Sequence, residues 1–321
     1  MSHPSPTISD YSDPQPQTAA RPSSPKSNRK SQILPALSAF ASDIKIHHTV
    51  FALPFALLST FLASGGMPRP GILLLILICM VTARTAAMAV NRLLDARLDA
   101  LNPRTARRAI PSGTLSVRFY VLATCFCSAT FIGATAVFQV LYRNPWPVIF
   151  SVPVLAWLSA YPLFKRFTRL CHYWLGASLA LAPVCAWIAV KGNLELPPVW
   201  MFVAVLFWTA GFDIIYACQD YAVDVRDGLY SVPARMGIAR ALWIARLSHI
   251  VCAAGLVLLG LSTPRFGPIY FTGVSLAIVL LIIEHTLVSE KNLSKIGLAF
   301  FTMNGILSLA IGTLGIIDVF V

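Results

Sequence analysis

Residues 71–99 read GILLLILICMVTARTAAMAVNRLLDARLD. The first part of this stretch is almost wholly apolar over the roughly 20 residues that an α-helix needs to cross a bilayer. Its end carries Asn91, Asp95 and Asp99, each four residues from the next. Positions four apart share one face of an α-helix. The stretch therefore predicts a membrane-spanning helix with a polar stripe at one end.

Similar apolar segments recur along the whole chain. Only 12% of the 321 residues are charged, whereas a soluble domain has about 25%, so a soluble enzyme is excluded. The sequence predicts an all-α, multi-pass membrane protein with nine transmembrane helices around a central cavity. The expected spans are 48–66, 71–91, 118–139, 146–163, 173–190, 198–217, 240–261, 268–288 and 296–317.

The basic residues predict the orientation of these spans. With a cytoplasmic amino terminus, 20 of the 25 Lys and Arg residues fall on the cytoplasmic side and 4 on the other. Cytoplasmic loops of membrane proteins are enriched in Lys and Arg. We therefore expect a protein of the inner, cytoplasmic membrane with its amino terminus inside. The net charge of +12 then needs no nucleic-acid partner.

The amino-terminal segment differs in composition from the rest of the chain. Residues 1–31 hold eight Ser and six Pro without an apolar run, which is typical of disordered chains. We expect a disordered cytoplasmic tail at 1–31 and a membrane domain at 32–321. The seven cysteines are scattered and fit neither a disulfide framework nor a zinc site. Nothing in the sequence predicts an obligate protein partner.

A second acidic stripe lies at the end of the span 198–217, on the same predicted side. Residues 213–224 read DIIYACQDYAVD, so helical spacing would align Tyr216, Asp220 and Asp224 on one face. Neighbouring carboxylates repel one another unless cations lie between them. Mg²⁺ is suitable, because it binds one or two carboxylates and takes further oxygens from phosphates.

Two charges lie deeper within the predicted spans. Arg84 precedes the first stripe by about two helical turns, and Asp213 precedes Asp220 and Asp224 by a similar distance. Charges at such depth face a polar cavity or an opposite charge. Arg84 and Asp213 either form an ion pair that joins two helices or line a shared cavity.

Each stripe is followed by a loop that contains arginine, at 102–113 (NPRTARRAIPSG) and at 227–235 (DGLYSVPAR). Arginine binds phosphate oxygens through two parallel N–H groups. Acidic stripes next to arginine loops are therefore expected where Mg²⁺ and a diphosphate bind together.

Together these motifs resemble the UbiA superfamily of intramembrane aromatic prenyltransferases over roughly residues 40–317. The two stripes are similar to the two aspartate motifs of that family. The resemblance implies transfer of a polyprenyl group from polyprenyl diphosphate to an aromatic acid, with formation of a C–C bond. It also implies a cavity open to the cytoplasm and, for the prenyl chain, sideways to lipid. Further similarities lie at Arg84, at 104–113, and at Tyr161 with Lys165 and Arg166.

The resemblance also implies a role for each residue of the site. Mg²⁺ would be held by Asn91, Asp95, Asp99, Asp220 and Asp224. Diphosphate contacts are expected at Lys45, Arg104, Arg108 and Lys165, and aromatic walls at Tyr161 and Tyr216. Arg84 would hold the acceptor carboxylate, while Asp213 would orient Arg84 or the acceptor hydroxyl. His48 is a further candidate, although a single His at a helix start is more often structural.

Some features depart from the family pattern and leave the acceptor open. Gln219 stands where the second motif has Lys, and Ala109 stands where many members have Pro. The pattern KIHHTVFALP at 45–54 resembles a 4-hydroxybenzoate polyprenyltransferase-like branch associated with menaquinone made through futalosine. The acceptor is thus 4-hydroxybenzoate, as in ubiquinone synthesis, or a hydroxynaphthoate. A secondary transporter is the alternative from another class, because intramembrane charges also mark transport paths.

Overall fold

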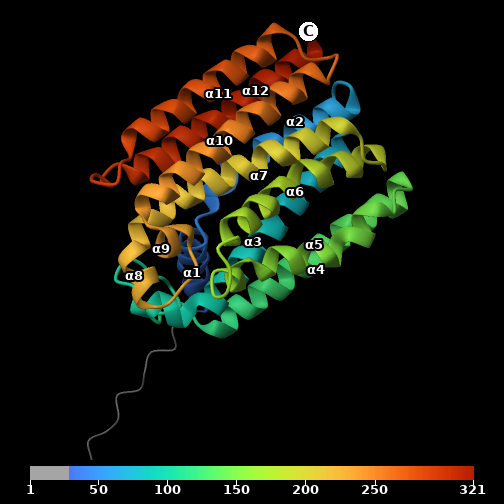
Figure 1. Cartoon of the computed structure of the whole chain (residues 1–321). Coiled ribbons are helices and arrows are strands. Elements are labelled where there is room, and N and C mark those ends of the chain that lie inside the picture. The colour runs from blue at the N-terminus through green and yellow to red at the C-terminus, as the bar shows by residue number, and fades with distance from the viewer. Residues whose placement is uncertain (1–28) are drawn as a thin grey trace, which may run out of the picture.

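The computed structural model describes the backbone of residues 29–321 and the side chains of residues 34–45 and 49–321. Throughout this part of the chain the regular elements are helices, which lie side by side in an elongated bundle (Figure 1). The predicted all-α class is confirmed. The predicted tail lies outside the described residues except for its last three positions, which begin helix α1 (Arg29–Asp43). The side chain of His48 also lies outside them.

Eight helical segments in the described chain are long and apolar enough to cross a membrane, by length and composition. Each corresponds to one of the expected spans. α7 is continued by two short helical segments and α12 is preceded by a π-helical turn, η3 (Leu298–Met303). The eight are α3 (Pro70–Leu101), α4 (Val117–Tyr142), α5 (Trp146–Phe164), α6 (Cys171–Lys191), α7 (Leu196–Ala217), α10 (Ile238–Leu261), α11 (Pro268–Leu287) and α12 (Asn304–Phe320).

The first expected span, 48–66, has a shorter helix. The chain forms a 3₁₀ segment, η1 (Ile46–Phe51), and then α2 (Leu53–Ser64). Pro54 lies in the first turn of α2, where its missing N–H is no loss. Gly65 ends the helix with a φ of 67°, which glycine adopts without strain. Whether this segment crosses the membrane, as the count of nine requires, stays a prediction.

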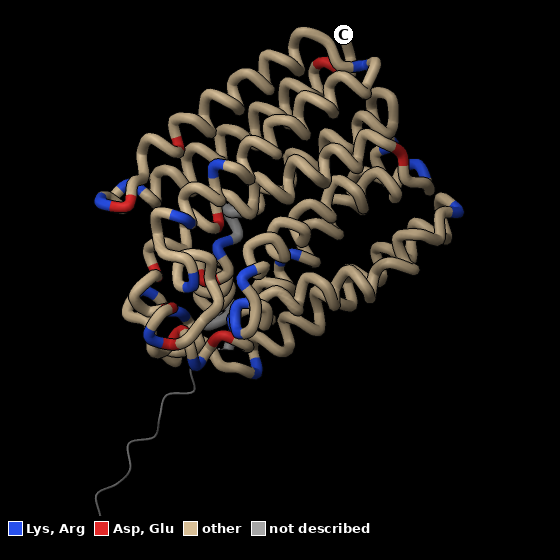
Figure 2. The backbone as a smooth tube through the Cα atoms, in the orientation of Figure 1, with Lys and Arg blue, Asp and Glu red and all other residues tan. Residues whose placement is uncertain are grey.

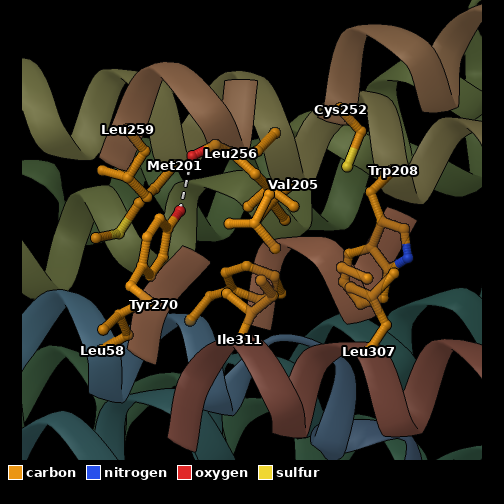
Figure 3. Packing of buried hydrophobic residues seen from close by; sticks show 14 of the residues in the cluster. Leu58, Met201, Val205, Trp208, Cys252, Leu256, Leu259, Tyr270, Leu307 and Ile311 are labelled. Carbon is orange, nitrogen blue, oxygen red and sulfur yellow. Dashed lines mark hydrogen bonds between the residues drawn. The ribbon is translucent and has the colours of Figure 1, made fainter. Parts of the chain in front are cut away.

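The core of the bundle lies around α7, which packs between α6 and α10, while α2 packs on α6 and α12. Figure 3 shows Trp208 of α7 between Cys252 of α10 and Leu307 of α12. The ring of Phe55 from α2 lies 5.4 Å from that of Trp208, centroid to centroid. The hydroxyl of Tyr270 is buried there and donates to the carbonyl of Leu256 at 2.9 Å. Buried polar groups of this kind are stable only with a partner.

A buried polar network joins α7, α11 and α12 next to this core. The side-chain amide of Asn304 donates to Glu284 Oε1 and to the carbonyls of Ala299 and Phe300 in the π-helical turn. The indole N–H of Trp208 donates to the Asn304 side-chain oxygen. The Asn304 side chain thus adds a hydrogen bond to two carbonyls of this turn. The turn places the ring of Phe300 4.2 Å from that of Tyr216, centroid to centroid.

Charged side chains gather at one end of the bundle. α1 and the two short helices α8 (Tyr221–Arg226) and α9 (Val232–Met236) lie at this end (Figure 1), where Figure 2 shows most of the Lys, Arg, Asp and Glu residues. Large apolar side chains are exposed along the outer helices, for example Leu122, Phe126 and Ile250. An apolar exterior with charge at its ends is the surface of an integral membrane protein.

Candidate active site

Two adjoining pockets lie between the helices. The polar pocket is lined by both acidic stripes, by the loop 102–116 (the arginine loop) and by Lys165 and Asp213. The apolar pocket extends between α3, α4, α5 and α6 and includes Arg84. Asn91 and Tyr161 line both pockets. A substrate with a charged head and an apolar chain fits this arrangement.

The first stripe lies on one face of α3, as its spacing predicts. Asp95 and Asp99 are buried, being 2% and 6% exposed. Lys165 Nζ donates to Asp95 Oδ2 at 2.6 Å, and Asn91 Nδ2 lies 3.4 Å from the same oxygen. Arg108 Nη1 donates to both oxygens of Asp99 at 2.7 and 2.8 Å. Buried carboxylates are thus neutralised by bases from the arginine loop and from the end of α5.

The second stripe differs from the expected continuous α-helix. α7 ends at Ala217, a 3₁₀ turn, η2, covers Cys218–Asp220, and α8 follows. A 3₁₀ turn has 3.0 residues per turn instead of 3.6, which changes the direction of Asp220 relative to Tyr216. Even so, Tyr216, Asp220 and Asp224 all line the polar pocket.

Arg104 connects the arginine loop to the second stripe. Its Nε and Nη2 donate to the two oxygens of Asp220 at 2.9 and 2.6 Å, and Nη1 donates to Tyr216 Oη at 3.3 Å. Asn102 Nδ2 donates to Asp220 Oδ1 at 3.2 Å. Burial lowers the pKa of Arg104, but the hydrogen bonds and the charge of Asp220 outweigh burial and raise the pKa. Arg104 therefore stays charged.

The donor atoms of the polar pocket fit Mg²⁺. Asp95 Oδ1 is buried without a hydrogen-bond partner in the described chain, and Arg166 Nη2 lies 3.6 Å away. Among the described residues, no three His, Cys, Asp or Glu side chains converge enough to hold one ion. An ion here would bind one or two carboxylates and take its other oxygens from diphosphate or water, which is the coordination that Mg²⁺ prefers.

The two deep charges, Arg84 and Asp213, do not pair in the structure. Asp213 Oδ2 instead lies 2.7 Å from Nδ1 of His172, and it faces the polar pocket. Arg84 faces the apolar pocket, where its Nε is buried without a hydrogen-bond partner among the described residues. Lys45 lines neither pocket, and its Nζ lies 6.0 Å from the ring centroid of Tyr216.

The sequence matches the model of the UbiA prenyltransferase family over residues 52–306. This chain belongs to the UbiA prenyltransferase family. A 4-hydroxybenzoate octaprenyltransferase of Nitrosomonas europaea is 28% identical over 247 residues, which cover 77% of this chain and 82% of that protein. The resemblance in the sequence motifs is therefore confirmed.

Solved structures agree with this UbiA assignment. The apo structure of a UbiA homologue from Aeropyrum pernix K1 matches with a TM-score of 0.72 and 28% identity, over 86% of this chain and 98% of that one. A UbiA homologue from Archaeoglobus fulgidus, solved with GPP and Mg²⁺, matches with a TM-score of 0.66 over 88% of this chain and 100% of that one. At 19% identity, the second match shows the fold alone.

The structure shows where both departures from the UbiA motifs lie. Gln219 is exposed, lines neither pocket, and donates from its side chain to the Tyr216 carbonyl at 2.9 Å. The backbone N–H of Ala109 donates to Asp43 Oδ1 at 3.0 Å. Proline has no backbone N–H, so this hydrogen bond requires a residue other than proline at position 109.

Asp43 ties together several parts of the UbiA site, and the sequence analysis missed it. Besides Ala109, its carboxylate accepts from the Tyr120 hydroxyl and lies 3.2 Å from Arg92 Nε. Arg92 in turn donates to the Asn91 side chain at 2.9 Å. The sequence offered one indication of the importance of Asp43, because the chain has no other acidic residue between Asp13 and Asp95.

Replacing Asp43 with alanine is expected to loosen the arginine loop. Losing hydrogen bonds to a charged group costs about 1.5–3 kcal/mol each, so we expect the KM for prenyl diphosphate to rise about tenfold to a hundredfold. Limited digestion with trypsin checks the structural cause, because cleavage after Arg104, Arg107 or Arg108 should become faster. Glu290→Gln, at an exposed carboxylate outside the site, serves as the control. Unchanged cleavage and KM in Asp43→Ala would contradict this role.

Proposed function

We propose that this protein transfers a polyprenyl group from polyprenyl diphosphate to an aromatic acid of the 4-hydroxybenzoate type, forming a C–C bond in ubiquinone or menaquinone biosynthesis. One observation carries the proposal. Both acidic stripes and the basic residues Arg104, Arg108 and Lys165 converge on a polar pocket that adjoins an apolar one. The 4-hydroxybenzoate octaprenyltransferase name of the Nitrosomonas relative supports the same reaction.

The polar pocket would bind the diphosphate. Mg²⁺, when bound, supplies positive charge that offsets the charge developing on the leaving diphosphate. Each ion would be held by one or two of Asp95, Asp99, Asp220 and Asp224, with Asn91 as an additional oxygen donor. Arg104, Arg108 and Lys165, which now hold carboxylates, would turn to phosphate oxygens, with Lys45 nearby. Such exchange favours breaking of the allylic C–O bond.

The apolar pocket would hold the prenyl chain. It is lined by aromatic and aliphatic residues such as Phe131, Phe138 and Phe150, which exclude water from the allylic cation. Tyr161, shared by the pockets, and Tyr216 present ring faces that attract a cation. Arg84 would bind the acceptor carboxylate, because its unpartnered Nε needs an acceptor.

We place the protein in the inner membrane with its amino terminus and polar pocket on the cytoplasmic side, from the distribution of Lys and Arg. A transporter would bind its substrate near the middle of the membrane. Here the acidic stripes lie at the charged end of the bundle, beside α8 and the arginine loop, which favours the enzyme. A guanidinium at Arg84 would serve the carboxylate of 4-hydroxybenzoate or of a hydroxynaphthoate equally well.

Incubation of the purified protein with Mg²⁺ and a polyprenyl diphosphate tests the reaction. We expect a prenylated product with 4-hydroxybenzoate or with a hydroxynaphthoate, supplied one at a time and detected by mass spectrometry. The acceptor that reacts identifies the pathway. Absence of product with both acceptors would reject the quinone assignment.

Removal of divalent metal tests the Mg²⁺ site separately. EDTA is expected to stop product formation, and excess Mg²⁺ should restore it. Binding of prenyl diphosphate, followed by quenching of tryptophan fluorescence, should also weaken in EDTA, since phosphate oxygens complete the coordination. Full activity and binding in EDTA would show that the carboxylates do not act through a metal.

A further inference from the structure

His172 and Asp213 form a pair in the wall of the polar pocket, and the sequence analysis had assigned no role to His172. His172 lies in the first turn of α6 and is 3% exposed. Its Nδ1 is 2.7 Å from Asp213 Oδ2, and both residues line the pocket. Asp213 therefore lines the pocket while one of its two oxygens is bound to a buried imidazole.

The second ring nitrogen of His172 defines its tautomer. The backbone N–H of Val232, at the start of α9, donates to Nε2 at 3.1 Å. An imidazole nitrogen that accepts a hydrogen bond carries no proton. The proton of the neutral ring is therefore on Nδ1, where it is donated to Asp213. Both nitrogens are engaged within the protein, so His172 offers neither of them to a substrate.

Asp213 is paired with an imidazole, unlike the other paired carboxylates of the polar pocket. Asp95, Asp99 and Asp220 each bind Lys or Arg. A neighbouring cation stabilises the ionised carboxylate and makes it a weaker base. Within the described part of the chain, Asp213 Oδ1 makes no hydrogen bond. Asp213 thus combines a partner other than Lys or Arg with an oxygen that is available to a substrate.

The depth of Asp213 would place it nearer to an acceptor held by Arg84 than to the diphosphate. It precedes Asp220 by seven residues, or about 10 Å at 1.5 Å per helical residue. It shares the polar pocket with Tyr161 and Asn91, which also line the apolar pocket beside Arg84. An aromatic acid bound by Arg84 would have its ring at this junction.

We infer that Asp213, positioned by His172, accepts the proton that the aromatic ring loses during prenyl transfer; the inference rests on the proposed function. The allylic C–O bond breaks and its electron pair leaves with diphosphate, while a ring carbon forms the new C–C bond. The C–H bond at that carbon then breaks, its electron pair restores the aromatic ring, and the proton moves to Asp213 Oδ1. Asp213 is the catalytic residue and His172 a positioning residue.

A deuterium isotope effect measures this proton transfer directly. The probes are geranyl diphosphate, Mg²⁺, and whichever of 4-hydroxybenzoate or the hydroxynaphthoate the wild type prenylates, deuterated at the carbons that react. In Asp213→Asn we expect product formation to fall about 10²–10⁴-fold, the usual contribution of a general base. Deuterium should then slow the reaction more than in the wild type, because C–H cleavage has become limiting. Diphosphate should still be released, with geraniol formed by capture of water.

Two conservative variants separate the functions of the His172 nitrogens. His172→Asn retains a donor near the Nδ1 position, facing Asp213, whereas His172→Gln retains an acceptor near the Nε2 position, facing Val232. We expect Asn to preserve more product formation than Gln, and His172→Leu to lose about tenfold to a hundredfold, as when the partner that orients an active group is removed. His285→Gln, a half-buried histidine lining neither pocket, is the matched control and should keep wild-type rates.

The outcomes distinguish this inference from the proposed function. An isotope effect that rises in Asp213→Asn and His172→Leu, while diphosphate release continues, supports the inference. If diphosphate release and product fall together and the isotope effect does not change, the inference is overturned but the proposed function is not. His172 would then serve only to hold α9 through Val232. A wild type that prenylates neither acceptor overturns the proposed function and the inference with it.

Discussion

Replacing Asp220 with alanine is expected to lower the rate of prenyl transfer by about a thousandfold or more while the protein remains folded in detergent. Asp220 is a proposed metal ligand and also the carboxylate that Arg104 holds through two hydrogen bonds. Loss of metal-assisted charge stabilisation removes several kcal/mol from the transition state, and each 1.36 kcal/mol is tenfold in rate. The measurement is the single-turnover rate of diphosphate release in Mg²⁺.

Glu195→Gln is the matched control for Asp220→Ala. Glu195 immediately precedes the same helix, α7, at its opposite end, and its nearest cation is Lys191 at 4.0 Å. Its replacement should leave the rate unchanged. Asp95→Ala should repeat the loss seen in Asp220→Ala, because it affects the other stripe. Near-wild-type rates in both Asp variants would remove the metal-site proposal.

Replacing Asn304 with leucine is expected to cause the largest loss of stability. The change keeps a similar volume but removes the Asn304 partner of two buried groups, the Glu284 carboxyl and the Trp208 indole N–H. Each buried group without a partner costs about 1–3 kcal/mol. We expect a clearly lower Tm in detergent, measured by size-exclusion chromatography after heating.

Ser308→Ala provides the comparison for Asn304→Leu. Ser308 is also buried in α12, but its hydroxyl bonds only to two backbone carbonyls, those of Val50 and Gly305. Its loss should lower the Tm less. The double variant Asn304→Leu with Glu284→Leu should recover part of the stability, since the buried carboxyl is then absent. Equal Tm values for Asn304→Leu and the wild type would show that this network contributes little.

The helical spans and the composition of the site could be predicted because their signals are local. A bilayer requires an apolar run of defined length, and such runs correspond to α3 to α7 and α10 to α12. The four-residue spacing of Asn91, Asp95 and Asp99 survives intact on α3. Segment 48–66 was less predictable, because hydropathy does not distinguish η1 from the first turn of a long helix.

Several contacts within the site could not be predicted, because they join residues far apart in the chain. Asp213 has an arginine at matching depth in sequence, yet its partner is His172, 41 positions away. Asp43 binds Ala109, 66 positions away. The 3₁₀ turn at Cys218–Asp220 could not be predicted either, since its residues are also compatible with an α-helix. A histidine next to the start of the apolar segment 173–190 was the one available clue to His172, because a buried imidazole needs partners.

The ion pairs of the polar pocket have a consequence for how the protein can exist without substrate. Lys165, Arg108 and Arg104 act as internal counter-ions for Asp95, Asp99 and Asp220. Under the proposed function, an incoming metal diphosphate would let these anions and cations exchange partners, as in a double displacement between two salts. The net charge of the pocket would change little in this exchange. The protein can therefore hold many charged side chains in a partly buried pocket, where unpaired charges would destabilise the folded state.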